Sequence, residues 1–137
     1  MIAEKPKLEI LDHDGPGYKP LVFSDGWQTA ILNWEPTAAL DQASEIEIHQ
    51  ETDEVFVLWR GRGALYVITE DGLRVVDLKP GVIYNVCRGT WHGVIATTDV
   101  SWIIIENRDT HLHDCEIRQL TVAEKNRIRS QAPQWAG

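Results

Sequence analysis

Cysteine and long apolar runs are scarce in this sequence. Its two cysteines, Cys87 and Cys115, could form at most one disulfide, so the chain is not a disulfide-scaffolded domain. No stretch approaches the roughly 18 apolar residues that a membrane-spanning helix requires. No apolar signal-peptide core follows Met1. We therefore expect a cytoplasmic protein that does not associate with membranes.

Positive charge is also in short supply. The chain has 13 lysine and arginine residues against 21 aspartate and glutamate residues, which gives a net charge of -8. Nucleic-acid binding requires clustered lysine and arginine to neutralise phosphates. We therefore expect no nucleic-acid partner, and acidic membrane surfaces are disfavoured for the same reason.

The composition does provide enough apolar material for a folded core. With 137 residues, of which 43% are hydrophobic, the chain has the size of one domain. We expect a single domain over residues 1–137, with an N-terminal arm (1–20), a β-rich body (21–107) and a C-terminal loop and helix (108–137). One strand is expected within the arm, at residues 8–11.

The body has the pattern of short antiparallel strands. Strands are expected at residues 21–23 and 27–34. Between residues 46 and 107, turn sequences such as those at 61–63 and 79–81 divide β-branched and aromatic runs into about six further strands. This regular spacing predicts an all-β protein, a barrel or sandwich of sequential antiparallel strands.

A helical pattern appears only near the end of the chain. Thr121 and Glu124 have the spacing of a capping box, in which each side chain accepts a hydrogen bond from the other residue's backbone N–H. We therefore predict a short helix over residues 122–130, which ends before Pro133.

Potential metal ligands are spaced through the centre of the body. Glu47 and His49 are two residues apart, so on a strand both side chains leave the same face. Residues 50–53 predict a turn, which resets strand parity before Glu54, and the fold has to bring in His92. Two imidazoles and two carboxylates suit a first-row divalent metal ion. We predict that these four residues bind Fe, Mn, Zn or Ni.

The same residues carry a resemblance to a known family. His49, Glu54 and Gly61 follow the pattern His-x4-Glu-x6-Gly, and Gly89 and His92 follow Gly-x2-His. These stretches resemble the two motifs of the cupin superfamily. The resemblance implies a small antiparallel β-barrel of the cupin or jelly-roll type, with a metal ion held inside by three histidines and one glutamate.

The resemblance covers roughly residues 40–107 and includes several departures. Glu47 stands where the first motif histidine would be, Cys87 where a proline would be and Ala96 where an asparagine would be. Glu47 could coordinate the metal directly, orient a bound water or repel anions. Cys87 could be a small core filler or a thiol near the mouth of the site.

Other groups with metal-binding chemistry have simpler interpretations. Glu51 shares the strand parity of the first two ligands, but we expect Glu51 and Asp53 to be solvated carboxylates. His111, His113 and the nearby Cys115 have a spacing that zinc sites use. This pair of histidines follows the last expected strand, however, and we interpret it as an exposed loop pair.

Strand alternation divides the large side chains between two faces. If Glu54 and His92 point inward, four apolar residues share their face and line a largely apolar pocket for a small molecule. These four are Phe56, Leu58, Val94 and Ala96. Trp59 and Trp91 then point outward. Because an exposed apolar face needs to be covered, we expect a homodimer that buries both tryptophans.

The resemblance to single-domain cupins implies a metal-dependent protein that acts on a small polar metabolite. The metal would polarise a carbonyl or carboxylate while Glu54 or Glu47 moves a proton, and isomerase, lyase and oxygenase chemistry are all compatible with these ligands. The alternative is a non-catalytic barrel that binds a small molecule, with or without a metal. The residues alone do not separate an enzyme from a binding protein.

Overall fold

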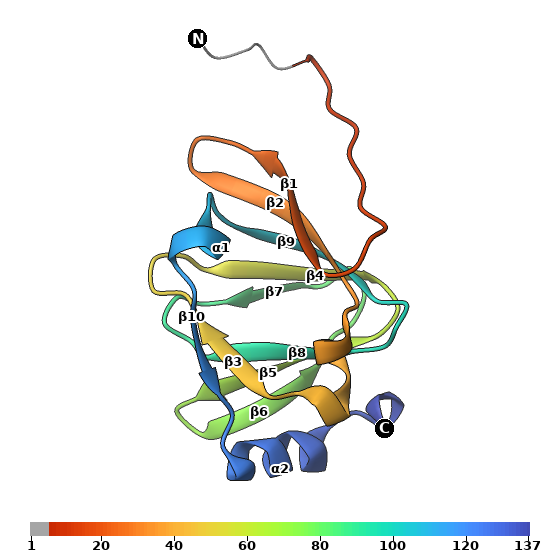
Figure 1. The fold of residues 1–137 in the computed structure, drawn as a ribbon, viewed down its shortest axis with the longest axis vertical. Coiled ribbons are helices and arrows are strands. Elements are labelled where there is room, and N and C mark those ends of the chain that lie inside the picture. The colour runs from red at the N-terminus through yellow and green to blue at the C-terminus, as the bar shows by residue number, and fades with distance from the viewer. Residues whose placement is uncertain (1–5) are drawn as a thin grey trace.

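Two five-stranded antiparallel sheets form the body of the protein (Figure 1). The structure is a computed structural model and describes residues 6–137. The first sheet contains, in spatial order, β1 (Tyr18–Phe23), β2 (Trp27–Asn33), β9 (Ser101–Asn107), β4 (Glu54–Arg60) and β7 (Ile83–Val86). The second contains β10 (Glu116–Gln119), β3 (Glu45–Ile48), β8 (His92–Ala96), β5 (Gly63–Thr69) and β6 (Gly72–Asp77).

The all-β prediction is confirmed, and the expected barrel of the jelly-roll type is confirmed in part: the described residues form two antiparallel sheets, but neither closes as a barrel. Within residues 6–137, no strand pairing closes either sheet on itself. The two sheets instead pack face to face, which is consistent with a jelly-roll sandwich. A barrel and a sandwich both consist of short antiparallel strands joined by tight turns, so turn spacing alone could not separate them.

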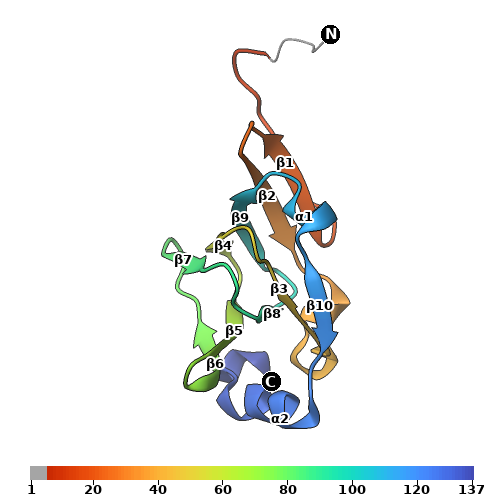
Figure 2. The same cartoon turned by 90° about the vertical axis from the view of Figure 1, so that its left-hand side faces the viewer.

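The strand boundaries differ from the expected ones mainly at the two ends of the chain. The expected strand at residues 8–11 is absent, since residues 6–17 form no strand, and residues 1–5 of the expected arm lie outside the described residues. The body extends beyond the predicted 21–107. It begins with β1 at Tyr18, and it includes β10, which pairs with β3 (Figure 2).

The helical segments are short. Helix α2 (Val122–Gln131) lies where the sequence predicts it, one residue longer than expected, and its capping box is formed, with Thr121 Oγ1 accepting from the Glu124 N–H at 3.1 Å. A one-turn helix α1 (Thr110–His113) precedes β10. The 3-10 turns η1 (Pro36–Ala38), η2 (Leu40–Gln42) and η3 (Gln134–Ala136) complete the set. In the described part of the chain, no helix combines the length and the apolar character needed to cross a membrane.

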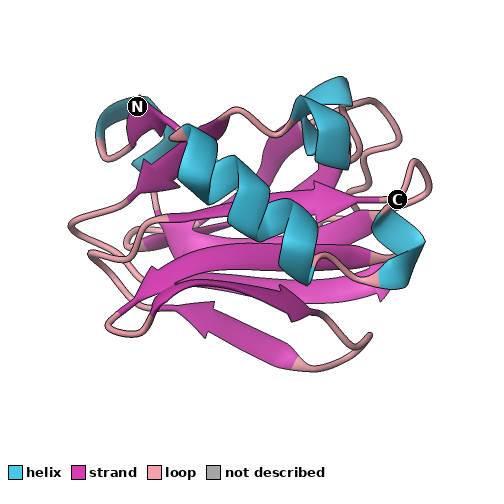
Figure 3. Cartoon of the chain, turned by 90° about the horizontal axis from the view of Figure 1, so that it is seen from below, coloured by secondary structure: helices cyan, strands magenta, loops and turns pink. Residues whose placement is uncertain are grey.

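Two hydrophobic clusters hold the layers together. The first fills the space between the two sheets and includes Phe56, Leu58 and Trp102. The second lies between the second sheet and α2, which packs across the outer face of that sheet (Figure 3). Burial of these side chains removes apolar area from water, at about 25 cal/mol for each Å². The candidate site adjoins the first cluster, since Phe56 and Trp102 also line its cavity.

Gly61, the last residue of the first motif, turns the chain between β4 and β5. Its φ of 72° lies in the left-handed region that residues with a side chain rarely adopt. A Cβ atom on Gly61 would also lie 2.7 Å from the backbone nitrogen and Cα of Val100. Both the backbone conformation and the close approach of Val100 therefore require glycine here.

Gly61→Ala should lower the free energy of unfolding by about 2–4 kcal/mol, because left-handed strain and overpacking add. Urea denaturation of the two proteins measures the difference. Gly26→Ala is the matched control, since a Cβ atom at Gly26 meets nothing within 4 Å. It should change the stability by less than about 0.5 kcal/mol. Equal effects of the two substitutions would contradict the assigned role of Gly61.

Candidate metal centre

Four potential metal ligands meet between the two sheets. The residues Glu47, His49, Glu54 and His92 each offer one ligand atom, and these atoms all lie within 4.8 Å of one another. Glu47 of β3 is directly opposite His92 of β8, so both side chains leave the same face of the second sheet. The chain leaves β3 after Ile48 and enters β4 at Glu54. The segment between these strands brings Glu54 to Glu47 and His49, and the pairing of β3 with β8 brings in His92.

Backbone carbonyls fix the orientation of both imidazole rings. His49 Nδ1 lies 2.6 Å from the Asp114 carbonyl oxygen, and His92 Nδ1 lies 2.9 Å from the Thr90 carbonyl oxygen. A carbonyl oxygen only accepts hydrogen bonds, so each Nδ1 carries a hydrogen and donates it. Each Nε2 is thereby turned toward the centre of the cluster, which is the arrangement found in metal-binding histidines.

Both Nε2 atoms approach the same carboxylate oxygen. The Nε2 atoms of His49 and His92 lie 3.1 Å and 2.8 Å from Glu54 Oε1. Glu47 Oε1 lies farther away, 3.9 Å from His49 Nε2 and 3.5 Å from His92 Nε2. A neutral Nε2 with a free lone pair and a carboxylate oxygen are both acceptors. The cluster therefore requires a cation between these atoms, either protons on the imidazoles or a metal ion.

Without a metal ion, protons fill this role. Burial alone lowers the pKa of His49, but its hydrogen bond to Glu54 and the charge of Glu54 outweigh burial and raise the pKa to about 9. Burial likewise opposes the charged form of His92, but Glu47 and Glu54 raise its pKa to about 10. Burial raises the pKa of Glu54, yet the hydrogen bonds from the two histidines lower it to about 2. The metal-free cluster is thus two imidazolium ions paired with carboxylates.

The same four residues fit a divalent metal ion. Two ligand atoms that are both about 2.1 Å from a metal, at right angles, lie about 3.0 Å apart. The measured separations from Nε2 to carboxylate oxygen, 2.8 to 3.9 Å, are of this size. Two imidazole nitrogens and two carboxylates are also a donor set that first-row divalent metals accept. The cluster could therefore hold a metal ion.

Asp114 supports the cluster from the segment that precedes β10. Its carboxylate accepts hydrogen bonds from the backbone N–H groups of Gln50 and Glu51, each at 2.9 Å, and so holds the turn between β3 and β4. Its carbonyl orients His49. The sequence pattern predicts a polar connection here and gives no signal for Asp114, because nothing local links residue 114 to residue 49.

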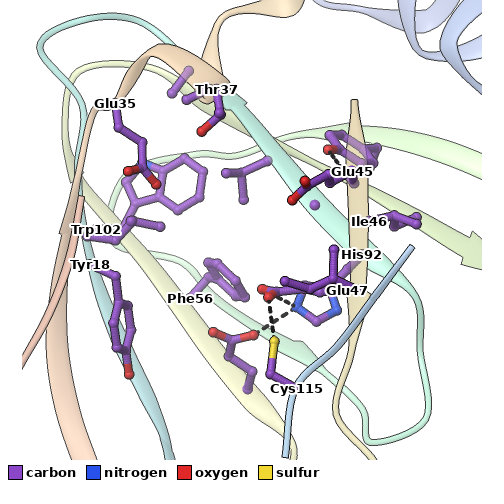
Figure 4. Close-up of a pocket in the computed structure, with 18 of the residues that line it drawn as sticks. Tyr18, Glu35, Thr37, Glu45, Ile46, Glu47, Phe56, His92, Trp102 and Cys115 are labelled. Carbon is purple, nitrogen blue, oxygen red and sulfur yellow. Dashed lines mark hydrogen bonds and ion pairs between the residues drawn. The ribbon is translucent and has the colours of Figure 1, made fainter. Parts of the chain in front are cut away.

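A cavity of about 340 Å³ opens beside the cluster. Figure 4 shows Glu47, His92 and Cys115 close together on one side of it, across from Tyr18 and Trp102. Three of the four apolar residues expected to line the pocket do so; Phe56, Val94 and Ala96 line it, and Leu58 lies in the core. The cavity is of a size that accepts a small molecule next to the candidate metal ligands.

Glu106 is a further carboxylate of the cavity, and it is not among the candidate site residues predicted from the sequence. It is only 5% exposed. Its Oε1 accepts a hydrogen bond from the Tyr18 hydroxyl at 2.6 Å, while its Oε2 has no hydrogen-bond partner in residues 6–137 and lies 4.0 Å from His49 Nε2. Burial, followed by the charge of Glu54, raises the pKa of Glu106 to about 7. The available signal was strand parity, which places Glu106 on the inward face of β9 with Trp102.

The predictions made for the second histidine pair and for Cys87 differ from the structure. The exposed His111 lies in α1, not in a loop; its Nδ1 is 3.0 Å from Gln28 Nε2, and it lines the cavity outside the group of four.

Cys87 is exposed and does not line the cavity, so it is neither a core filler nor a thiol of the site. The thiol at the site is Cys115, which donates to Glu47 Oε2 at 3.1 Å. Burial and Glu47 raise its pKa to about 12, which keeps it a thiol at neutral pH.

The expected solvated carboxylates remain outside the cluster. Glu51 and Asp53 are exposed. Asp53 accepts a hydrogen bond from the Arg88 backbone N–H at 2.9 Å, and this bond, followed by one from Asn85, lowers its pKa. These two carboxylates therefore belong to the surface loops.

The fold can be compared with known proteins now that the site is described. No family model matches the sequence, and no curated protein matches it significantly. Solved structures do match. A cupin-2 domain containing protein from Shewanella frigidimarina is 23% identical over 69% of this chain and 85% of its own, with a TM-score of 0.51. BH2720 from Bacillus halodurans is 18% identical over 84% and 83%, with a TM-score of 0.54. KdgF from Halomonas sp. is 17% identical over 69% and 82%, with a TM-score of 0.50. The protein therefore has the fold of the cupin superfamily, as its two motifs predict.

Proposed function

We propose that this protein is a metal-dependent cupin-type protein that acts on a small polar metabolite. The observation that carries the proposal is the approach of both histidine Nε2 atoms to Glu54 Oε1 at 3.1 Å and 2.8 Å, while both Nδ1 atoms are held by carbonyls. This arrangement requires a cation, and it borders a cavity of about 340 Å³. A bound divalent metal ion would polarise a carbonyl or carboxylate of the metabolite.

The two carboxylates of the cluster suit different tasks. Glu54 is only 5% exposed and is hydrogen-bonded to both imidazoles, so its role is to hold the cation. Glu47 has a side chain that is 36% exposed and lines the cavity at longer distances from the histidines. Glu47 is therefore the better candidate for moving a proton to or from the metabolite, in isomerase, lyase or oxygenase chemistry.

A binding protein without catalysis is the second candidate function. The observation in its favour is that protonated His49 and His92 satisfy Glu54 without a metal ion. The cavity could then remain formed in the metal-free protein and bind a metabolite.

Elemental analysis of the protein, purified without a histidine tag or chelator, tests the proposal. We expect stoichiometric divalent metal, and a metabolite screen on the metal-loaded protein should then identify a compound that is turned over. Metal-free protein that carries a bound metabolite, unchanged after incubation, would support the binding function instead.

We further propose a homodimer through the outer face of the first sheet. On this face Val55 lies opposite Ile105 and Val57 lies opposite Ile103. Trp59, on the same face, is 50% exposed. The predicted joint burial of Trp59 and Trp91 is wrong in one respect. Trp91 belongs to the second cluster, next to the second sheet, where Arg118 covers its ring at 5.0 Å.

The protein should sediment as a dimer at micromolar concentration, and Trp59→Glu should shift it to monomer, because a charge in an apolar interface is costly. Sedimentation velocity gives the mass of both proteins, and circular dichroism checks that the variant is folded. Val122→Glu is the control, since Val122 is 75% exposed at the start of α2. A wild-type protein that is strictly monomeric would rule the dimer out.

A further inference from the structure

Apart from the histidines, the charged side chains that line the cavity are all acidic. Within residues 6–137, no lysine or arginine lines it. The charged lining residues other than histidine are Glu35, Glu45, Glu47, Glu54 and Glu106. A divalent metal ion in the cluster would balance the charges of Glu47 and Glu54, and three carboxylates would remain. The field inside the cavity therefore attracts cations and repels carboxylates and phosphates.

Glu106 is held in one orientation by a chain of hydrogen bonds. Gln28 Nε2 lies 3.0 Å from His111 Nδ1 and donates to the Tyr18 hydroxyl at 2.8 Å. Tyr18 donates in turn to Glu106 Oε1 at 2.6 Å. At the end of this chain, Glu106 Oε2 is buried and makes no hydrogen bond to a described residue; the nearest cationic group is His49 Nε2, 4.0 Å away, which pairs with it only when His49 is protonated. A buried acceptor without a donor is costly, so this oxygen marks a position where a ligand can supply a hydrogen bond.

We propose that Glu106 binds the ammonium group of a small amine, and that the substrate of this site is therefore amine-bearing and not acidic. The inference rests on the proposed function, because it assigns a substrate class to the same cavity. An ammonium group satisfies Glu106 Oε2 with a charge-assisted hydrogen bond, and it also compensates one of the remaining negative charges. A neutral hydroxyl supplies only the hydrogen bond.

Glu106 is distinct from the metal ligands. It is not a member of the group of four whose ligand atoms lie within 4.8 Å of one another. It comes from β9 in the first sheet and lies beside His49, with 4.0 Å between its Oε2 and His49 Nε2. An ammonium group at Glu106 would therefore lie next to a metal ion in the cluster, and the rest of the molecule would extend into the cavity.

Matched sets of small molecules test this assignment. Each set contains an amine, an alcohol and an acid of similar structure. The first set is glucosamine, glucose and glucuronate, and the second is ethanolamine, ethylene glycol and glycolate. Calorimetric titration of the metal-loaded protein, in a buffer without primary amines, should show binding of the amine in at least one set and weaker binding of its alcohol and acid. Tighter binding of the acid, equal binding of amine and alcohol, or no binding of either amine would overturn the proposal.

Glu106→Gln keeps the shape of the side chain and removes its charge. It should weaken amine binding by about ten- to a hundredfold, the equivalent of one hydrogen bond to a charged group. Glu35→Gln removes a charge that also lines the cavity but is exposed, and it should change the affinity by less than about threefold, as for an exposed ion pair. Equal effects of the two substitutions would overturn the role of Glu106.

The metal content of Glu106→Gln and of the unmodified protein distinguishes an error in the ammonium site from an error in the proposed metal-dependent function. Glu106→Gln should keep the same metal content as the unmodified protein. Loss of the metal would make Glu106 a ligand and would overturn the ammonium site. Conversely, a metal-free protein that binds the amine only when Glu106 is present would sink the metal-dependent function and leave the amine site standing.

Discussion

His92→Ala and Glu54→Ala should each weaken metal binding by more than about a hundredfold. Loss of a residue that only hydrogen-bonds to a metal ligand already lowers metal affinity by about ten- to a hundredfold, and loss of a ligand should cost more. Each substitution removes a ligand atom from a group within 4.8 Å and leaves the remaining ligands too few. His111→Ala should leave the metal in place, because His111 bonds to Gln28 outside this group. Elemental analysis after desalting, followed by titration with zinc, measures the loss. If His111→Ala strips the metal and His92→Ala does not, the assigned histidines are the wrong ones.

Glu47→His is the informative companion variant. It restores the three-histidine set that the cupin motif contains, so it should retain the metal. If the metal is retained while turnover is lost, the Glu47 carboxylate is needed for more than coordination. Loss of the metal in Glu47→His would show that the position does not tolerate an imidazole as ligand.

Metal affinity should keep rising with pH well above the ordinary histidine pKa of 6.5. In the metal-free cluster the pKa of His49 is about 9 and that of His92 is about 10. Each must lose the proton on Nε2 before that nitrogen can bind a metal ion. Near pH 7, two protons should therefore leave for each metal ion that binds, and the affinity should rise about a hundredfold per pH unit. The slope should decrease as the pH passes through 9 and 10.

Calorimetry in buffers of different ionisation enthalpy counts the released protons. His111→Ala is the control and should release the same number as the unmodified protein, since His111 lies outside the cluster. An affinity that stays constant between pH 7 and 9 would show that the metal-free histidines are already neutral.

The same pKa shifts affect the stability of the metal-free protein in the opposite direction. The pKa values of His49 and His92 are raised on folding, so their contribution to stability is fully present below pH 6.5. It is lost as the pH rises through about 9 and 10. Rising pH should therefore destabilise the metal-free fold while it favours the metal-bound one.

The four candidate ligands that the structure brings together could be predicted from the sequence because most of the signals are local. Glu47 and His49 share a strand face, and the turn before Glu54 is visible in the residue types between them. His92 comes from a different strand, so its prediction depended on the fold bringing it in and was supported by the motif resemblance. Its position opposite Glu47 is a property of the sheet register.

The residues that orient and complete the site could not be predicted in this way. Gln28 and His111 are 83 positions apart, and Tyr18 and Glu106 are 88 positions apart. Contacts at such separations depend on which strands become neighbours, and one sequence does not reveal that. An inward carboxylate such as Glu106 stands out only once the face of β9 is known.

The errors in the predicted strand boundaries have similar causes. Strand β10 consists of Glu116, Ile117, Arg118 and Gln119, a short edge strand with a single apolar residue, and it has no alternation of apolar and polar positions to detect. Residues 8–11 do contain apolar side chains, but a strand also needs a partner, and no pairing to them exists in the described residues.

The bond from His49 to the Asp114 carbonyl has a consequence for synthesis and folding. The two residues are 65 positions apart, so the imidazole cannot be oriented until the chain has been made well past the second motif. Closure of such a distant contact belongs to the slow, non-local part of folding. A shortened chain that carries both motifs but stops before Asp114 would contain all four ligands and still lack the group that aims one of them. Metal capture should therefore be among the last events in the maturation of the protein.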